Sequence, residues 1–154
     1  MMREDLLLVM PQKPFHYQPI ADHWIANVRL FPGFSFELLR VLLQQPLEGL
    51  VLETYGAGNA PNYDPAFLAM LSEASLRGVL IVNCSQCQHG TVDMGHYVTG
   101  SALKTAGLLS GQDMTTEAVH CKLLYLLSKY TDKKQIQVNI EKSLVGELGH
   151  HSMH

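Results

Sequence analysis

The chain has 154 residues, of which 47% are hydrophobic and 16% are charged, with a formal net charge of −3. This length suits one domain, and the apolar fraction is large enough to build a core. The weak negative charge excludes a basic surface that binds nucleic acid or an anionic membrane. The longest apolar run, residues 6–10, is far shorter than the roughly 20 residues that a membrane span needs. Three cysteines cannot all pair with one another, which favours a reducing, cytoplasmic compartment.

The first 22 residues contain three prolines and no sustained hydrophobic period, which predicts an extended lead-in or inter-domain linker. After them, short apolar runs alternate with amphipathic segments. We expect strands at 24–31, 49–55 and 78–84, and helices at 35–45 and 65–77. The second helix has a clear start, because Asp64 can cap it and Pro65 suits its first position. The third strand is apolar throughout, as a strand buried on both faces should be.

Beyond residue 98 the pattern is helical. A short helix is expected before Gly107, a long one capped by Asp113, and a last one over about 132–142. Strands that alternate with helices over short connections imply right-handed crossovers and a parallel sheet between helical layers. The predicted fold is therefore a three-layer α/β/α domain with a small, mostly parallel sheet of about four strands. We place this domain at 23–149, followed by a disordered tail at 150–154.

Two loops follow the predicted strands at their carboxyl ends, where ligands bind in parallel sheets. The first is TYGAGNAP, residues 54–61. It has a G-x-G pattern, but Pro61 replaces the third glycine, so the fingerprint for dinucleotide binding fails. The glycines allow a tight turn or the close approach of a ligand. A plain turn capped by Asn59 is the alternative.

The second loop holds Cys84 and Cys87 in C-x-x-C spacing, followed by His89 and His96. A structural zinc site usually takes four ligands from two such pairs, and here His89 stands too close to the cysteines. A redox pair would sit at a helix N-terminus, whereas Cys84 falls at the end of a strand. We therefore predict no metal, and interpret both cysteines as buried or half-buried thiols. The residues alone show no nucleophile beside a base.

Five segments resemble, in order and spacing, the C-terminal domain of bacterial cytoplasmic (type I) L-asparaginases. They are LFPG (30–33), LETYGAGNAP (52–61), GVLIVNCSQC (78–87), GSALKTAGLLSGQDMTTEAVHCKL (100–123) and VGEL (145–148). The resemblance spans about residues 14–149, and animal relatives and an asparaginase-like amidotransferase subunit are further candidates. It implies a cofactor-free, cytoplasmic homo-oligomer, a dimer or tetramer, that hydrolyses L-asparagine to L-aspartate and ammonia.

In that family, the nucleophilic threonine lies in a TGGTIG motif of an N-terminal domain, which also holds an HGTDT motif. Neither motif occurs here, and the HGTVDM segment at 89–94 lies at the wrong place in the fold. We therefore expect the catalytic domain to precede this chain, and the chain alone to be inactive. The asparagine of the family's YGxGN motif reaches into the neighbouring subunit's active site. This implies a substrate-binding role for Asn59, with Gly56 and Gly58 shaping its loop.

Some type I enzymes bind asparagine at a second, effector site between subunits. They use an arginine two residues before the YGxGN tyrosine, together with the N-x-[ST]-Q-C loop. Ser85 and Cys87 match that loop, but Glu53 stands at the arginine's position. An arginine would hold the effector's carboxylate, whereas a glutamate would repel it. The resemblance thus implies that Glu53, Ser85 and Cys87 lie in a loop at a subunit interface or effector site, where Glu53 argues against binding of this effector. A stand-alone α/β module that dimerises without catalysis is the alternative function.

Overall fold

The computed structural model describes residues 14–61, 64–87, 89–94 and 98–149. The predicted tail at 150–154 and the first 13 residues of the predicted lead-in lie outside these ranges. The elements found in the described ranges are β1 (Ile25–Arg29), α1 (Phe36–Leu43), β2 (Gly49–Thr54), α2 (Pro65–Leu76), β3 (Leu80–Ser85), α3 (Val98–Thr105), β4 (Leu109–Ser110), α4 (Thr116–Lys129) and α5 (Lys133–Ile140).

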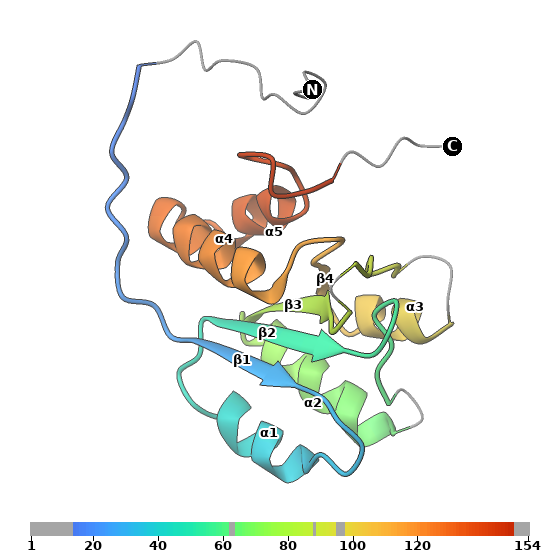
Figure 1. Ribbon diagram of the computed structural model, residues 1–154. Coiled ribbons are helices and arrows are strands. Elements are labelled where there is room, and N and C mark those ends of the chain that lie inside the picture. Colours follow the sequence, from blue (N-terminus) through green and yellow to red (C-terminus); the bar gives the residue numbers. More distant parts are fainter. Residues whose placement is uncertain (1–13, 62–63, 88, 95–97, 150–154) are drawn as a thin grey trace, which may run out of the picture.

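The strands form one parallel sheet in the order β1-β2-β3-β4, with the helices on either side (Figure 1). The central pair, β2 and β3, runs in register from Gly49 opposite Leu80 to Thr54 opposite Ser85. Because all strands run the same way, their carboxyl ends share one edge of the sheet. The predicted α/β fold with a small parallel sheet of about four strands is confirmed.

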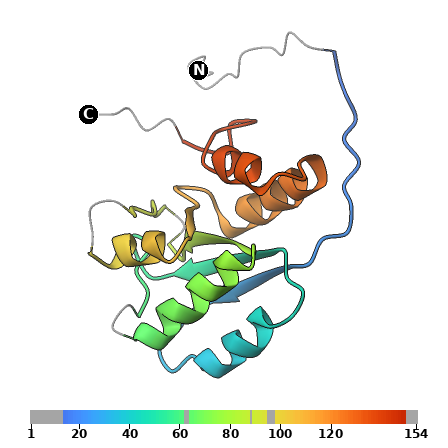
Figure 2. The same cartoon turned by 180° about the vertical axis from the view of Figure 1, so that it is seen from behind.

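Two apolar layers cover the two faces of the sheet (Figures 1 and 2). On one face, Leu50, Leu52 and Ile81 pack against α1, α2 and α3. On the other face, residues of opposite parity, among them Val51 and Val82, pack against α4 and α5. β2 and β3 are therefore buried on both sides, as the uniformly apolar run at 78–84 predicted.

The helix starts follow local capping chemistry. The carboxylate of Asp64 accepts hydrogen bonds from the N–H groups of Ala66 (2.9 Å) and Phe67, so the predicted cap of α2 is confirmed. The predicted Asp113 cap of α4 is wrong. Thr115 is the N-cap, and its hydroxyl accepts from the N–H of Ala118 at 3.3 Å.

The described part of the lead-in is extended and runs past the C-terminal end of α4 (Figure 1). The side-chain amide of Gln18 donates to the carbonyl of Ser128 at 3.2 Å, and the N–H of Ala21 donates to the Ser128 hydroxyl at 3.1 Å. These contacts attach the segment to α4 before it enters β1. Across the described residues, no helix is long and apolar enough to cross a membrane.

Candidate functional site

The glycine loop leaves β2 as a tight turn between Tyr55 and Asn59. The N–H of each of these residues donates to the carbonyl of the other at 2.7 Å. Gly56 and Gly58 have φ angles of +51° and +96°, where a side chain would strain the backbone. A β-carbon on Gly58 would also lie 2.8 Å from the side chain of Val92. The two glycines therefore set the course of the loop that carries Asn59.

Two polar side chains of β3 donate hydrogen bonds to backbone carbonyls of this loop. Asn83 is fully buried; its amide oxygen accepts from the Thr54 hydroxyl at 2.7 Å, and its amide nitrogen donates to the Gly58 carbonyl at 3.1 Å. The hydroxyl of Ser85 donates to the Gly56 carbonyl at 2.6 Å. The sequence analysis missed Asn83 and Thr54. Their signal was a polar residue near the carboxyl end of each strand, after a run of apolar residues.

The C-x-x-C cysteines lie in different environments. Cys84 is fully buried in β3, one residue before the strand ends. Burial raises the pKa of its thiol to about 12, and the nearby charge of Glu53 adds to this effect. Cys87 is exposed in the loop that follows, so the prediction of a buried or half-buried thiol is wrong for this residue. Its N–H donates to the Ser85 hydroxyl at 3.0 Å. Among the described residues, no three His, Cys, Asp or Glu side chains are grouped to hold a metal ion; His96 lies outside them.

The three residues predicted at an interface lie together. Glu53, Ser85 and Cys87 line an open cleft of about 390 Å³ at the carboxyl edge of the sheet, beside the start of α4. The guanidinium of Arg29 shares this cleft and lies 3.8 Å from the Glu53 carboxylate. Arg29 is 62% exposed and Glu53 16%, so Glu53 is the inner member of the pair. Asn59 is not among the residues that line the cleft.

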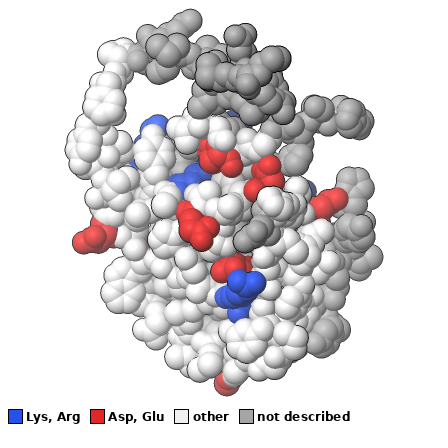
Figure 3. Space-filling view, viewed as in Figure 1, with Lys and Arg blue, Asp and Glu red and all other residues white. Residues whose placement is uncertain are grey.

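Arg29 was also missed by the sequence analysis, although β1 places it directly beside Glu53 in the sheet register. Its charge balances the glutamate at the position where the resemblance expected an arginine. Over the described part of the face in Figure 3, basic and acidic atoms are sparse and lie near each other rather than forming a patch of one sign. This distribution agrees with the absence of a basic stripe in the sequence.

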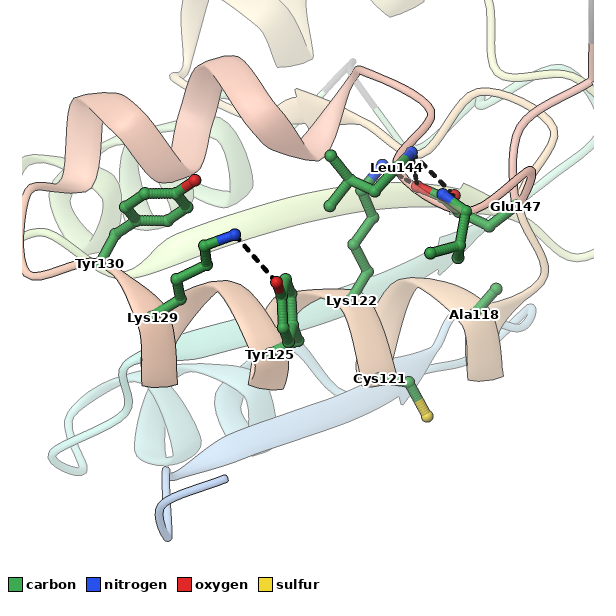
Figure 4. Close-up of a pocket in the computed structure, with 9 residues that line it drawn as sticks. Ala118, Cys121, Lys122, Tyr125, Lys129, Tyr130, Leu144 and Glu147 are labelled. Atoms are coloured by element: carbon green, nitrogen blue, oxygen red, sulfur yellow. Dashed lines mark hydrogen bonds and ion pairs between the residues drawn. The ribbon is translucent and has the colours of Figure 1, made fainter. Parts of the chain in front are cut away.

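A larger cavity of about 560 Å³ lies between α4 and the segment that follows α5 (Figure 4). Tyr125 and Tyr130 form part of its wall, and the ammonium of Lys129 lies over both rings, 2.9 Å from the Tyr125 hydroxyl. Leu144 and Val145 also line the cavity, and Leu144 lies across from these α4 side chains (Figure 4). This cavity is built by α4 and the segment after α5, and not by the glycine loop or the loop after β3.

A buried ion pair fastens the segment over this cavity. The ammonium of Lys122 lies 2.6 Å from the Glu147 carboxylate, which also accepts from the N–H groups of Leu144 (3.0 Å) and Val145 (2.7 Å). Burial alone would raise the pKa of Glu147, but the hydrogen bonds from Lys122 and the backbone outweigh it and lower the pKa to about 2. The signal for this pair was a lysine on the apolar face of α4, three residues after Val119.

A parallel α/β layer with a glycine loop and a polar β3 loop at its carboxyl edge defines the class of α/β domain in which ligands bind at that edge. A family model described as the glutaminase/asparaginase C-terminal domain matches residues 25–139, and the chain belongs to this family. The resemblance predicted from its motifs is thus confirmed.

Individual relatives agree with this assignment. The chain is 47% identical to L-asparaginase 1 of Escherichia coli K12 over 130 residues, which are 84% of this chain and 38% of that protein. It is 46% identical to L-asparaginase of Dirofilaria immitis over 136 residues, 84% of this chain and 22% of that protein. The crystal structure of L-asparaginase I from Vibrio cholerae superposes with a TM-score of 0.85 at 43% identity, covering 90% of this chain and 42% of that one. The chain thus spans about two fifths or less of these proteins.

Proposed function

We propose that the chain is the C-terminal domain of an L-asparaginase, an amidohydrolase that converts L-asparagine to L-aspartate and ammonia. The family match over residues 25–139, with 47% identity to L-asparaginase 1 of Escherichia coli, carries this proposal. The domain covers residues 23–149 and residues 1–22 are its linker to the catalytic domain. The enzyme is a cytoplasmic homo-oligomer and needs no cofactor. Because the chain lacks the TGGTIG and HGTDT motifs, it supplies support and substrate contacts rather than the nucleophile.

Asn59 is the residue that we assign to the neighbouring subunit's active site, with Gly56 and Gly58 shaping its loop. An asparagine amide offers a donor and an acceptor, which suit the ammonium and carboxylate of an amino-acid substrate. The paired hydrogen bonds between Tyr55 and Asn59 support this role, because they fix the backbone from which the amide projects. A group held in advance loses less entropy when it binds a substrate.

Oligomer formation has support from the described surface. Trp24, Phe31, Leu38 and Val145 are large apolar side chains, and each is more than half exposed. We assign part of this exposed apolar surface to contacts with other domains or subunits. We also place Glu53, Ser85 and Cys87 at a subunit interface. The pairing of Glu53 with Arg29 supports a cleft there that does not hold the carboxylate of an asparagine effector.

The test is a chimera in which this chain replaces the matching C-terminal part of Escherichia coli L-asparaginase 1. We expect the purified chimera to release ammonia from asparagine. Asn59→Ala should lower kcat/KM by roughly 10- to 1,000-fold, the effect of losing a hydrogen bond to a charged group in the transition state. Its melting temperature should change little, because Asn59 lies on a loop.

Asn139→Ala is the matched control, since Asn139 lies on α5 and its amide bonds only within that helix, to the Gln135 carbonyl at 2.7 Å. It should leave kcat/KM unchanged. A chimera that folds and oligomerises yet releases no ammonia would contradict the proposed function. An active chimera in which Asn59→Ala behaves like Asn139→Ala would contradict the site.

A further inference from the structure

Three consecutive carbonyl groups of the glycine loop are held by donors from β3 and from the segment after it. The bonds are Ser85 Oγ to Gly56 O (2.6 Å), Asp93 N–H to Ala57 O (3.1 Å) and Asn83 Nδ2 to Gly58 O (3.1 Å). Every residue between the paired Tyr55 and Asn59 is therefore bonded to β3 or to the segment after it. A plain surface turn does not need such bonds, because water can satisfy its carbonyls.

Asn83 is the innermost of these donors. It is fully buried, and it follows Ile81 on the face of β3 that packs against α1, α2 and α3. Its amide is fixed at both ends, because Thr54 donates to the oxygen while the nitrogen donates to Gly58. An apolar side chain at this place would avoid the free-energy cost of burying an amide. The two hydrogen bonds, from Thr54 and to Gly58, therefore explain why a buried amide stands at this position.

The carbonyl of Gly58 and the N–H of Asn59 belong to one peptide unit. Asn83 binds the carbonyl of this unit at 3.1 Å, and the Tyr55 carbonyl accepts its N–H at 2.7 Å. A peptide unit is planar, so two bonds on its opposite sides fix its orientation. That orientation sets the direction in which the Asn59 side chain leaves the backbone.

We infer that Asn83 is a positioning residue that aims Asn59 by holding the peptide unit before it. The inference rests on the proposed function for what Asn59 contacts, but the hydrogen bond from Asn83 to the Gly58 carbonyl is a property of this chain. Without the donor, the Gly58 carbonyl can turn to water, because glycine tolerates many backbone conformations. A site works only when its groups stay within about 0.5 Å and 10–20° of the productive geometry, so a looser Asn59 binds the transition state less well.

Asn83→Leu tests the hydrogen bond to Gly58, since leucine has the same branched skeleton, with bulkier methyl groups, and no donor. In the chain itself, backbone amide order parameters from NMR should fall at Gly58 and Asn59, from about 0.85 toward about 0.6. Ile136→Val is the control for stability, because Ile136 is buried on the opposite face of the sheet. It should leave these order parameters unchanged. If Asn83→Leu also leaves them unchanged, the inference is overturned.

The second arm measures kinetics in the active chimera. Asn83→Leu should lower kcat/KM by about tenfold, and adding it to Asn59→Ala should lower kcat/KM no further, because both changes remove one interaction. Independent, multiplying effects would overturn the inference, since Asn83 would then act by another route. If Asn83→Leu lowers the order parameters of the loop while Asn59→Ala has wild-type kinetics, the proposed role of Asn59 in the active site fails. The inference that Asn83 fixes the loop is then still supported.

Ser85→Ala is a second variant in case Asn83→Leu does not fold. It removes the donor to Gly56 from a residue near the end of β3 and keeps Asn83 in place. Order parameters should fall at Gly56 and, less strongly, at Asn59. Wild-type values throughout the loop would count against a held loop as a whole.

Discussion

The Glu147 carboxylate, which pairs with Lys122 and accepts hydrogen bonds from backbone N–H groups, should stabilise the folded chain by about 3 kcal/mol at neutral pH. The two side chains are only 4% and 12% exposed, and their charged atoms lie 2.6 Å apart. The pKa of Glu147 is lowered from 4.5 to about 2, and about 1.4 kcal/mol per pH unit gives about 3 kcal/mol. Glu147→Gln keeps an oxygen for the backbone N–H groups but removes the charge. We therefore expect it to lower the free energy of unfolding by about 2–3 kcal/mol at pH 7.

This contribution should depend on pH in one direction. Because the pKa of Glu147 is lower in the folded state than in the unfolded state, the unfolded state takes up the proton first as the pH falls. The stabilisation is complete above about pH 4.5 and is lost as the pH falls toward about 2. The difference in unfolding free energy between the wild type and Glu147→Gln should shrink over this window.

The assay is urea unfolding followed by circular dichroism at about pH 7, 4.5, 3 and 2.5. Glu73→Gln is the matched control, since Glu73 pairs with Arg77 at 2.9 Å but is 75% exposed. Such a surface pair contributes about 0–1 kcal/mol. Equal small losses for the two variants at pH 7 would refute the reasoning. A loss in Glu147→Gln that stayed constant from pH 7 to pH 2.5 would refute the pH argument.

Two further predictions follow from burial and from backbone geometry. At about pH 8 a thiol reagent should modify the exposed Cys87 and Cys121 in the native chain, and Cys84 only after denaturation. The reason is that burial, and to a smaller extent the charge of Glu53, raises the pKa of the Cys84 thiol to about 12. Three reactive thiols in the native chain would contradict this prediction. Gly58→Ala should lower the free energy of unfolding by about 2–3 kcal/mol, since φ is +96° and the new methyl group meets Val92. Gly33→Ala is the control, because Gly33 has a similar φ of +85° but no atom near the added methyl group, and it should lower the free energy of unfolding by about 1 kcal/mol. Equal losses of stability for the two variants in thermal melting would argue against crowding at Gly58.

The elements of the fold could be predicted because their signals are local. The apolar run of β3 and the Asp64-Pro65 start of α2 depend on residues that lie next to one another in the chain. The cap of α4 was mispredicted at Asp113, because its carboxylate accepts the N–H of Gly149 at 2.9 Å instead, a bond that sequence spacing does not indicate. Where a residue distant in the chain can also bind a capping side chain, the tertiary structure decides whether that side chain caps the helix.

The candidate site divides in the same way. The glycine loop could be predicted from residue order alone, because YGAGNAP has a recognisable spacing and only glycine adopts the φ angles of Gly56 and Gly58 freely.

Three pairings could not be predicted from the sequence and depend on how the chain packs: Arg29 with Glu53, Asn83 with Gly58, and Lys122 with Glu147. In each pairing the partners are more than 20 residues apart in the chain. Periodicity assigns a side chain to a face of its own strand or helix, but a polar contact needs atoms within about 4 Å. Which polar groups come that close depends on how the sheet and helices pack, because buried charges and amides persist only where a partner offsets the loss of water.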